Sequence, residues 1–432
     1  MQLFNIIAIL ITLSALFAWL NDRFLKLPTA IGLMLIALLM SVFLLLPIPG
    51  TNGLEEDIRF MVDSIDFDAT VLHGMLSFLL FAGALHVSLK ELAEHKWVIA
   101  VLASVSVLIS TILVGGIAWL LFMLLGLDIP LIYCLLFGAL ISPTDPIAVL
   151  GILKSAGAPK ALELKITGES LFNDGVAVVL FMVLFEIAVG GEHVTLGSAL
   201  HLFLKEAIGG LLLGLASGGI AFLMLRKIDN YQVEVLITLA VASGSYALAE
   251  HLHLSAPITV VVAGLIIGNQ VRNQLLSDKT KSHLDNFWEL TDEILNAVLF
   301  VMIGLEVLVI SISGPALIAG LLAIPLVLVA RVISVGAPVA WMRRFRSFST
   351  GAITILTWGA LRGGISVALV LSLPESEVRD LLLTVTYIVV VFSILVQGLT
   401  LGPVVQRIGA RANLEMERTE LPRPPALADG ER

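Results

Sequence analysis

Two short polar stretches interrupt an otherwise apolar chain and carry residue types that bind cations. In "ISPTDPIAVL", Asp145 lies between Pro143 and Pro146. In "ITGESLFNDGVAVVLF", Ser170 and Asp174 are four residues apart, a spacing that places two side chains on the same face of a helix. Carboxylate, hydroxyl and amide oxygens are the ligands that hard cations prefer. The predicted chemistry is therefore binding of a monovalent cation.

The second stretch also suggests how a proton could take part. Glu169 and Asn173 are four residues apart as well, so the polar groups gather on one stripe of a helix whose other faces are apolar. Desolvation raises the pKa of a buried carboxyl group, so such a group can exchange a proton for a cation near neutral pH. Competition of Na+ and H+ for one site, combined with alternating access, would be sufficient for antiport.

The elements that must position these residues are membrane helices. Of the 432 residues, 58% are hydrophobic and 14% charged, with a mean hydropathy of +1.02, far above the values of soluble proteins. Apolar runs long enough to cross a bilayer recur along the chain. They predict thirteen spans, at about 3–20, 29–46, 69–87, 97–125, 130–152, 163–189, 201–225, 233–250, 255–270, 289–310, 315–341, 349–373 and 380–406.

Charge gives these spans an orientation. When the gaps between spans are assigned alternately, 20 of the 25 Lys and Arg residues fall on one side, which the positive-inside rule makes the cytoplasm. The N-terminus is then outside and the C-terminus inside, with residues 407–432 as a short disordered cytoplasmic tail. The net charge of −9 reflects an acidic outer loop around Glu55 to Asp68, so no nucleic-acid partner is expected.

Five ionisable residues fall near the predicted middle of the membrane, where each charge costs roughly 2.5–3.5 kcal/mol. They are Asp145, Glu169, Asp174, Arg331 and Arg362. One interpretation is that they are internal ion pairs that only fix the helix bundle. The interpretation we favour is an ion pathway, because intramembrane charges commonly mark transport routes.

Two predicted spans should be broken. Pro143 and Pro146 each remove an amide donor and disfavour the helix before them, so the fifth span should unwind around Asp145. The twelfth span contains "TWGALRGGISVAL", and we expect its glycines to loosen the helix around Arg362. These glycines are Gly359, Gly363 and Gly364. Two interrupted helices running in opposite directions are typical of inverted repeats with a substrate site near the midplane.

Several stretches together resemble one known family. The segment "SPTDPIAVLGILKSAGAPKALELKITGESLFNDGVAVVLF" is similar to the sodium/proton exchanger branch of the bacterial monovalent cation:proton antiporters. Further similarity lies in "LAEHLHLSAPITVVVAGLIIGN", "FWELTDEILNAVLFVMIGLE" and "WGALRGGISVAL". The resemblance implies an all-α polytopic fold with inverted repeats and two crossing broken helices. It also implies a mobile core, about 69–189 and 289–373, and a dimerisation scaffold, about 1–46 and 201–270.

The resemblance assigns roles to individual residues. Asp174 would be the main cation and proton carboxylate, and Ser170, Asp145 and the Thr144 backbone would complete the shell of the Na+ ion. Asn173 would hold the geometry of the site, and an Asn-Asp pair implies electroneutral exchange of one cation for one proton. Two further features concern charge: Glu169 would pair with either Arg331 or Arg362, and Ala82 replaces an acidic residue common in relatives.

These observations predict a secondary active antiporter that exchanges Na+ or Li+ for H+, and not an enzyme. It would be a homodimer in lipid of the inner (cytoplasmic) membrane, would serve pH homeostasis and would need no cofactor. A K+/H+ antiporter or potassium efflux system is the main alternative, because the sequence shows oxygen ligands but not the radius of their site. A distant alternative is an intramembrane aspartyl hydrolase that uses two carboxylates.

Overall fold

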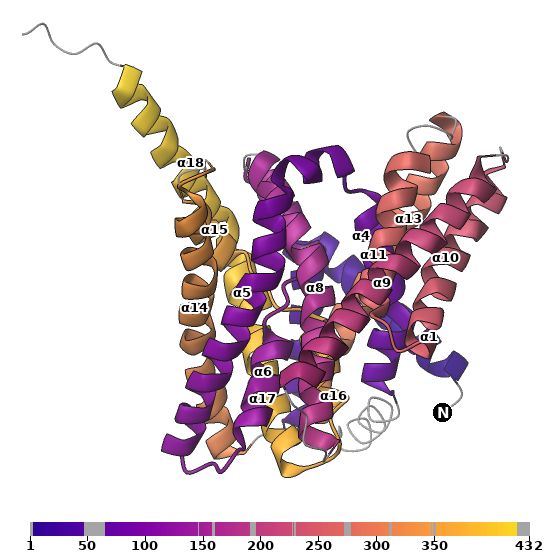
Figure 1. Ribbon diagram of the computed structural model, residues 1–432. Helices are drawn as coiled ribbons and strands as arrows, with labels where there is room; N and C mark the ends of the chain where they lie inside the picture. Colours follow the sequence, from indigo (N-terminus) through magenta and orange to yellow (C-terminus); the bar gives the residue numbers. More distant parts are fainter. Residues whose placement is uncertain are drawn as a thin grey trace, which may run out of the picture.

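The computed structural model describes residues 3–46, 65–145, 147–157, 160–190, 196–226, 228, 230–271, 278–310, 313–346, 348 and 351–420. This described part of the chain is helical and contains no strand (Figure 1). Pro146 and most of the predicted acidic outer loop, including Glu55, lie outside it.

The described residues of the N-terminal half of the chain form a succession of helices. They are α1 (Leu3–Leu20), the π-helical turn η1 (Asn21–Leu25), α2 (Thr29–Leu45), η2 (Ala69–Met75), α4 (Leu76–Leu85), α5 (Leu89–Leu124), α6 (Leu131–Ile141), α7 (Ile147–Ser155) and α8 (Lys160–Val189). α5 begins eight residues before its predicted start, because the Ser88 hydroxyl accepts a hydrogen bond from the Glu91 amide and caps the helix.

The described residues of the C-terminal half also form a succession of helices. It comprises α9 (Leu196–Leu225), α10 (Tyr231–His251), α11 (Ala256–Ile266), η3 (Ile267–Val271), α13 (Asp278–Glu306), α14 (Gly314–Met342), α15 (Ala352–Trp358), α16 (Gly364–Leu371), α17 (Glu377–Phe392), η4 (Ser393–Gln397) and α18 (Gly398–Glu420). α18 continues well past 407, so the prediction of a disordered tail from that residue is wrong up to Glu420. The sequence from 408 to 420 is mostly polar or charged and gave no apolar signal for the helix.

Seven of the described helices are long and apolar enough to cross a membrane, and four shorter apolar helices accompany them. Each predicted span coincides with one helix or with two or three consecutive helical elements. The all-helical polytopic fold is therefore confirmed, whereas the count of thirteen spans stays a prediction.

Both predicted breaks are present. α6 ends at Ile141 and α7 begins at Ile147, with Pro143 between them, while α15 ends at Trp358 and α16 begins at Gly364. Pro143 contributes to the first break because it has no amide donor. Ser142 before it keeps helical dihedral angles, φ −77° and ψ −34°, so the expected shift of that residue away from helical geometry does not occur.

The second break needs a different explanation from the one expected. Gly363 has φ −117°, ψ −165°, an extended conformation open to any residue. Its missing side chain matters instead, since a Cβ there would lie 2.8 Å from Oδ2 of Asp145. Gly364 is likewise pressed against Leu299 of α13. These glycines permit close approach and do not supply backbone freedom.

The helices lie in two groups on either side of α8 (Figure 1). α5 and α14 lie on one side, and α9, α10 and α13 lie on the other. α5 packs along α6, α8 and α14, and α9 packs on α11 through three glycines spaced four residues apart. At one of them, Gly210, the carbonyl accepts a hydrogen bond from the Thr259 hydroxyl over 3.1 Å.

Two adjacent glycines of α5 allow a test of this packing. A Cβ on Gly115 would lie 2.8 Å from Cα of Leu135 in α6, whereas a Cβ on Gly116 would meet nothing within 4 Å. We expect Gly115→Ala to cost about 1–3 kcal/mol through overpacking. Gly116→Ala should be neutral or stabilising, because alanine favours a helix over glycine. Thermal unfolding of the purified variants in detergent checks both, and equal midpoints would contradict the close α5–α6 contact.

Candidate functional site

Thr144, in the extended segment after α6, is held against α8 by four polar contacts. Nδ2 of Asn173 donates to Oγ1 of Thr144 over 2.8 Å, and the Thr144 amide donates to Oδ1 of Asn173 over 3.4 Å. The Ser170 hydroxyl donates to the Thr144 carbonyl oxygen over 2.5 Å, and the two hydroxyl oxygens are 2.8 Å apart. All three residues are buried. The backbone groups that the break releases are thus satisfied by α8, as a lipid environment requires.

Asp145 joins the two breaks. Its amide donates to the carbonyl oxygen of Leu361 over 2.8 Å, so the two extended segments touch through their backbones. Its carboxylate lies against Gly363, the residue before α16, and Asp145 itself precedes the start of α7 by two residues. Helix N-termini favour negative charge, so this position stabilises a carboxylate at membrane depth.

Arg362 hydrogen-bonds the backbone carbonyl groups at the α6 end of the first break. Its Nη1 donates to the carbonyl oxygens of Ser142 over 2.8 Å and of Pro143 over 2.9 Å, and the residue is only 2% exposed. These carbonyls follow the last turn of α6 and have no helical partner of their own. The guanidinium therefore caps the negative end of α6 from the other broken helix.

Glu169 pairs with Arg331 and not with Arg362. Nη2 of Arg331 donates to Oε1 of Glu169 over 2.5 Å, and the two side chains are 3% and 2% exposed. This pair links α8 to α14. The choice that the sequence left open is settled by packing, because Arg362 is already occupied by the α6 carbonyls.

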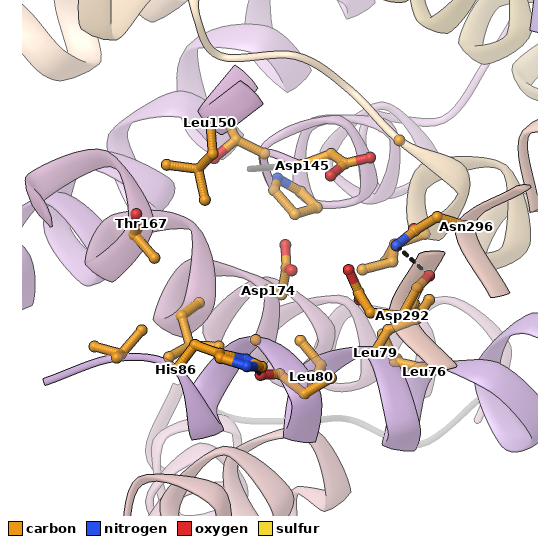
Figure 2. Close-up of a pocket in the computed structure, with 18 of the residues that line it drawn as sticks. Leu76, Leu79, Leu80, His86, Asp145, Leu150, Thr167, Asp174, Asp292 and Asn296 are labelled. Atoms are coloured by element: carbon orange, nitrogen blue, oxygen red, sulfur yellow. Dashed lines mark hydrogen bonds between the residues drawn. The ribbon is translucent and has the colours of Figure 1, made fainter. Parts of the chain in front are cut away.

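Asp174 lies at the inner end of a cavity of about 840 Å³ (Figure 2). Asp145 and Thr144 line the same cavity, which also reaches Glu91 and Lys160 in the first turns of α5 and α8. Asp174 is 4% exposed, and its Oδ1 has no hydrogen-bond partner among the described residues. A buried oxygen that accepts nothing from the protein is available to a cation or a proton.

The cavity is strongly acidic. Its described lining contains eight carboxylates, namely Glu91, Asp145, Glu163, Asp174, Asp285, Glu289, Asp292 and Glu293, against one Lys and no Arg. That lysine, Lys160, bonds Glu91 over 2.7 Å, and the carboxylate raises the pKa of its ammonium group. Walls of one sign raise the local concentration of counter-ions, so this lining attracts cations.

Sequence reasoning missed the contribution of α13 to this cavity. Asp292 and Asn296 line it, and Asn296 is 5% exposed. Their spacing of four residues within an apolar span was the available signal. In the sequence, several charged residues lie near Asp292, a pattern that is typical of a helix exposed at the surface.

The structure brings the five predicted cation-site residues together around the first break. Asp174, Asp145 and Thr144 line the cavity, whereas the described contacts of Ser170 and Asn173 are with Thr144. Their roles as ligands stay predictions. Ala82 also lines the cavity and leaves an apolar surface there.

Comparison with known proteins places the chain in a family. The family model for "Sodium/hydrogen exchanger, transmembrane" matches residues 10–407. The chain belongs to the sodium/hydrogen exchanger family. It is 51% identical to the Na(+)/H(+) antiporter NhaP of Pseudomonas aeruginosa, over 95% of this chain and 98% of that protein. It is 39% identical to the Na(+)/H(+) antiporter NhaH of Halobacillus dabanensis, over 90% and 93% of the two chains.

The fold is that of a solved relative. The sodium proton antiporter MjNhaP1 from Methanocaldococcus jannaschii superposes with a TM-score of 0.73 at 18% identity, over 94% of this exchanger and 99% of that chain. With the family membership, this fold makes the protein a multi-pass membrane transporter.

The contact between Gly363 and Asp145 gives the first prediction for this exchanger. A methyl group in Gly363→Ala must displace the Asp145 carboxylate or the backbone of the second break. We expect sodium-dependent proton movement in proteoliposomes to fall about tenfold to hundredfold, since small misplacements of binding groups are costly. Gly402→Ala is the control, because its Cβ would make only an ordinary contact of 3.6 Å with Ile152. Equal activity of the two variants would show that Asp145 needs no fixed position.

The Glu169–Arg331 pair gives the second prediction. Arg331→Met leaves a buried, uncompensated carboxylate and should cost about 3–5 kcal/mol of stability. The double variant Glu169→Met with Arg331→Met removes both charges at similar volume and should recover much of that loss. The readout is the thermal midpoint and the monodisperse fraction in size-exclusion chromatography. A double variant no more stable than Arg331→Met would refute the direct pairing.

Proposed function

We propose that this protein exchanges Na+ or Li+ for H+ across the cytoplasmic membrane by alternating access, with both ions competing for Asp174. The observation that carries the proposal is the buried Asp174 carboxylate, whose Oδ1 has no partner among the described residues and which ends an acidic cavity. Such a group can hold a proton or a cation, but a bound proton weakens its attraction for the cation. The named antiport activity of the NhaP and NhaH relatives supports the same conclusion.

The remaining ligands follow from the contacts around Thr144. Asp145 and Thr144 line the cavity with Asp174, and the Ser170 hydroxyl donates to the Thr144 carbonyl oxygen. The carbonyl oxygen has two lone pairs, so its bond from Ser170 leaves one for a cation. Asn173 holds Thr144 in place through its amide and carries no charge that could titrate.

This distribution of charge supports electroneutral exchange. The Glu169 and Arg331 side chains neutralise each other, and Arg362 is committed to backbone carbonyls. If Asp174 carries one Na+ in one direction and one proton in the other, the loaded site has the same charge both ways. The exchange ratio would then be one cation for one proton.

The topology predicted from Lys and Arg places the cavity mouth, near Lys160 and Glu91, on the cytoplasmic side. The described conformation is then inward-facing, with the N-terminus outside and the C-terminus in the cytoplasm. Alternating access would follow from movement of the core, about 69–189 and 289–373, against a scaffold, about 1–46 and 201–270, through which two chains dimerise. Such an exchanger would serve pH homeostasis.

The decisive experiment measures the collapse of a preformed pH gradient in proteoliposomes after separate addition of Na+, Li+ or K+. We expect a response to Na+ and Li+ that Asp174→Asn abolishes, because the amide cannot exchange a proton. Asp128→Asn is the matched control, since this exposed residue lies in the connection between α5 and α6, away from the cavity. A potassium and valinomycin clamp at different membrane potentials tests electroneutrality through an unchanged sodium-dependent rate.

Each outcome separates the candidates. A response to K+ alone would favour a K+/H+ antiporter or potassium efflux system. Sodium exchange that survives in Asp174→Asn with an unaltered pH profile would remove Asp174 from the mechanism. A rate that follows membrane potential would reject the ratio of one to one.

A further inference from the structure

We propose that Asn296 and Asp292 of α13 form the second wall of the cation site and pass the cation to Asp174. The proposal rests on the exchange function above and deepens it. It adds two binding residues that set the apparent affinity for Na+.

The first support is the orientation of the Asn296 amide. Its Nδ2 donates to the Asp292 carbonyl oxygen over 2.8 Å, which fixes which end of the amide faces the helix (Figure 2). The other end, Oδ1, is buried and has no partner among the described residues. Asn296 lines the cavity, so an acceptor without a described partner belongs to a residue of the same lining as several carboxylates.

The second support is that Asp174, like Asn296, has a buried acceptor oxygen without a described partner. Oδ1 of Asp174 is also buried without a described partner, and both residues line one cavity. Two acceptors cannot satisfy each other by hydrogen bonding. A hard cation, bare or carrying water, satisfies both at once. The pairing therefore points to a cation and not to an anionic or apolar ligand.

The third support is the arrangement of α13. Asp285, Glu289, Asp292 and Asn296 follow one another at spacings of four, three and four residues, so they share one helical face. All four line the cavity, over about 16 Å of helix from Asp285 to Asn296. Figure 2 shows the Asp292 carboxylate on the side of the cavity toward Asp174. This face offers a cation successive oxygens, and the deepest one, on Asn296, adds no charge beside Asp174.

Packing holds α13 on two sides. Gly304, near its end, presses against Ala37 of α2, and its carbonyl accepts a hydrogen bond from the Ser41 hydroxyl over 3.0 Å. On its other side Leu299 contacts Gly364 at the start of α16. The Asn296 oxygen is thus positioned by packing on both flanks.

The test measures half-saturating Na+ for exchange in proteoliposomes and, without turnover, Na+ binding by isothermal titration calorimetry. Asn296→Ala should weaken both by about tenfold with little change in maximal rate, whereas Asn296→Asp, which keeps an oxygen, should largely retain binding. Asp292→Asn should also weaken binding. Glu293 also lines the cavity but is exposed, so Glu293→Gln removes the same charge and reports the electrostatic attraction of an exposed part of the lining.

A change in ionic strength distinguishes direct binding of Na+ from long-range electrostatic attraction of Na+ to the cavity. Salt screens distant charges, so added choline chloride should remove the effect of Glu293→Gln while the effects of Asn296→Ala and Asp292→Asn persist. Unchanged Na+ affinity in folded Asn296→Ala, or an Asp292→Asn effect that disappears with salt like that of Glu293→Gln, would overturn the proposal. If one of these two outcomes is found while the wild-type protein binds and exchanges Na+ normally, the proposal for α13 is refuted and the proposed exchange function is not. Absence of Na+ exchange and binding in the wild type would instead refute the function on which it rests.

Discussion

The structure depends on satisfying backbone groups that two broken helices release inside a membrane. An unpaired amide or carbonyl group in hydrocarbon costs several kcal/mol, so each break needs partners from the protein. Each break supplies partners to the other. Arg362, in the second break, caps the carbonyls of Ser142 and Pro143, and the Asp145 amide bonds the Leu361 carbonyl. The breaks therefore stabilise each other only while they cross, and this crossing fixes where Asp145 lies.

α8 completes the arrangement by meeting the crossing from the side. Asn173 and Ser170 hold Thr144, and Glu169, which directly precedes Ser170, links the same helix to α14 through Arg331. Asp174 follows Asn173 directly, so the contacts that clamp the break also position its carboxylate at the inner end of the cavity. In this site the residues that preserve the fold and those proposed to bind the ion are neighbours on one helix. Substitutions here should therefore be tested for folding as well as transport.

Local signals allowed the breaks and the main carboxylates to be predicted from sequence. Pro143 acts on its own turn of helix, and Asp145 and Asp174 are conspicuous because charges are rare in apolar spans. The choice of Arg331 over Arg362 for Glu169 depends on which carbonyls each guanidinium meets, which only packing decides. The glycines of the second break were recognised, but their mechanism was wrong, because the steric demand comes from Asp145 and Leu299, far away in sequence. Asp292 and Asn296 were missed for a related reason: they line the same cavity as Asp174 although they lie far from it in sequence.

The distribution of charge and amide groups limits what the proposed exchange can do. Within the core of the site, Glu169 is neutralised by Arg331, and Arg362 is held by carbonyl oxygens. Asn173 and Asn296 each donate a hydrogen bond from Nδ2 to a neighbouring oxygen. They can therefore position a neighbour or offer an acceptor oxygen without adding a charge. The carboxylates that face the cavity at this depth are Asp145, Asp174 and Asp292, and of these Asp174 is the most buried. If a cation moves from the α13 face to Asp174, it passes from the oxygens of α13 to the Asp174 carboxylate. The uncharged Asn296 amide then leaves no additional unpaired charge behind. A carboxylate at either asparagine position would still offer an oxygen to the cation but would add a charge to the site, which is a physical reason for amides at both positions.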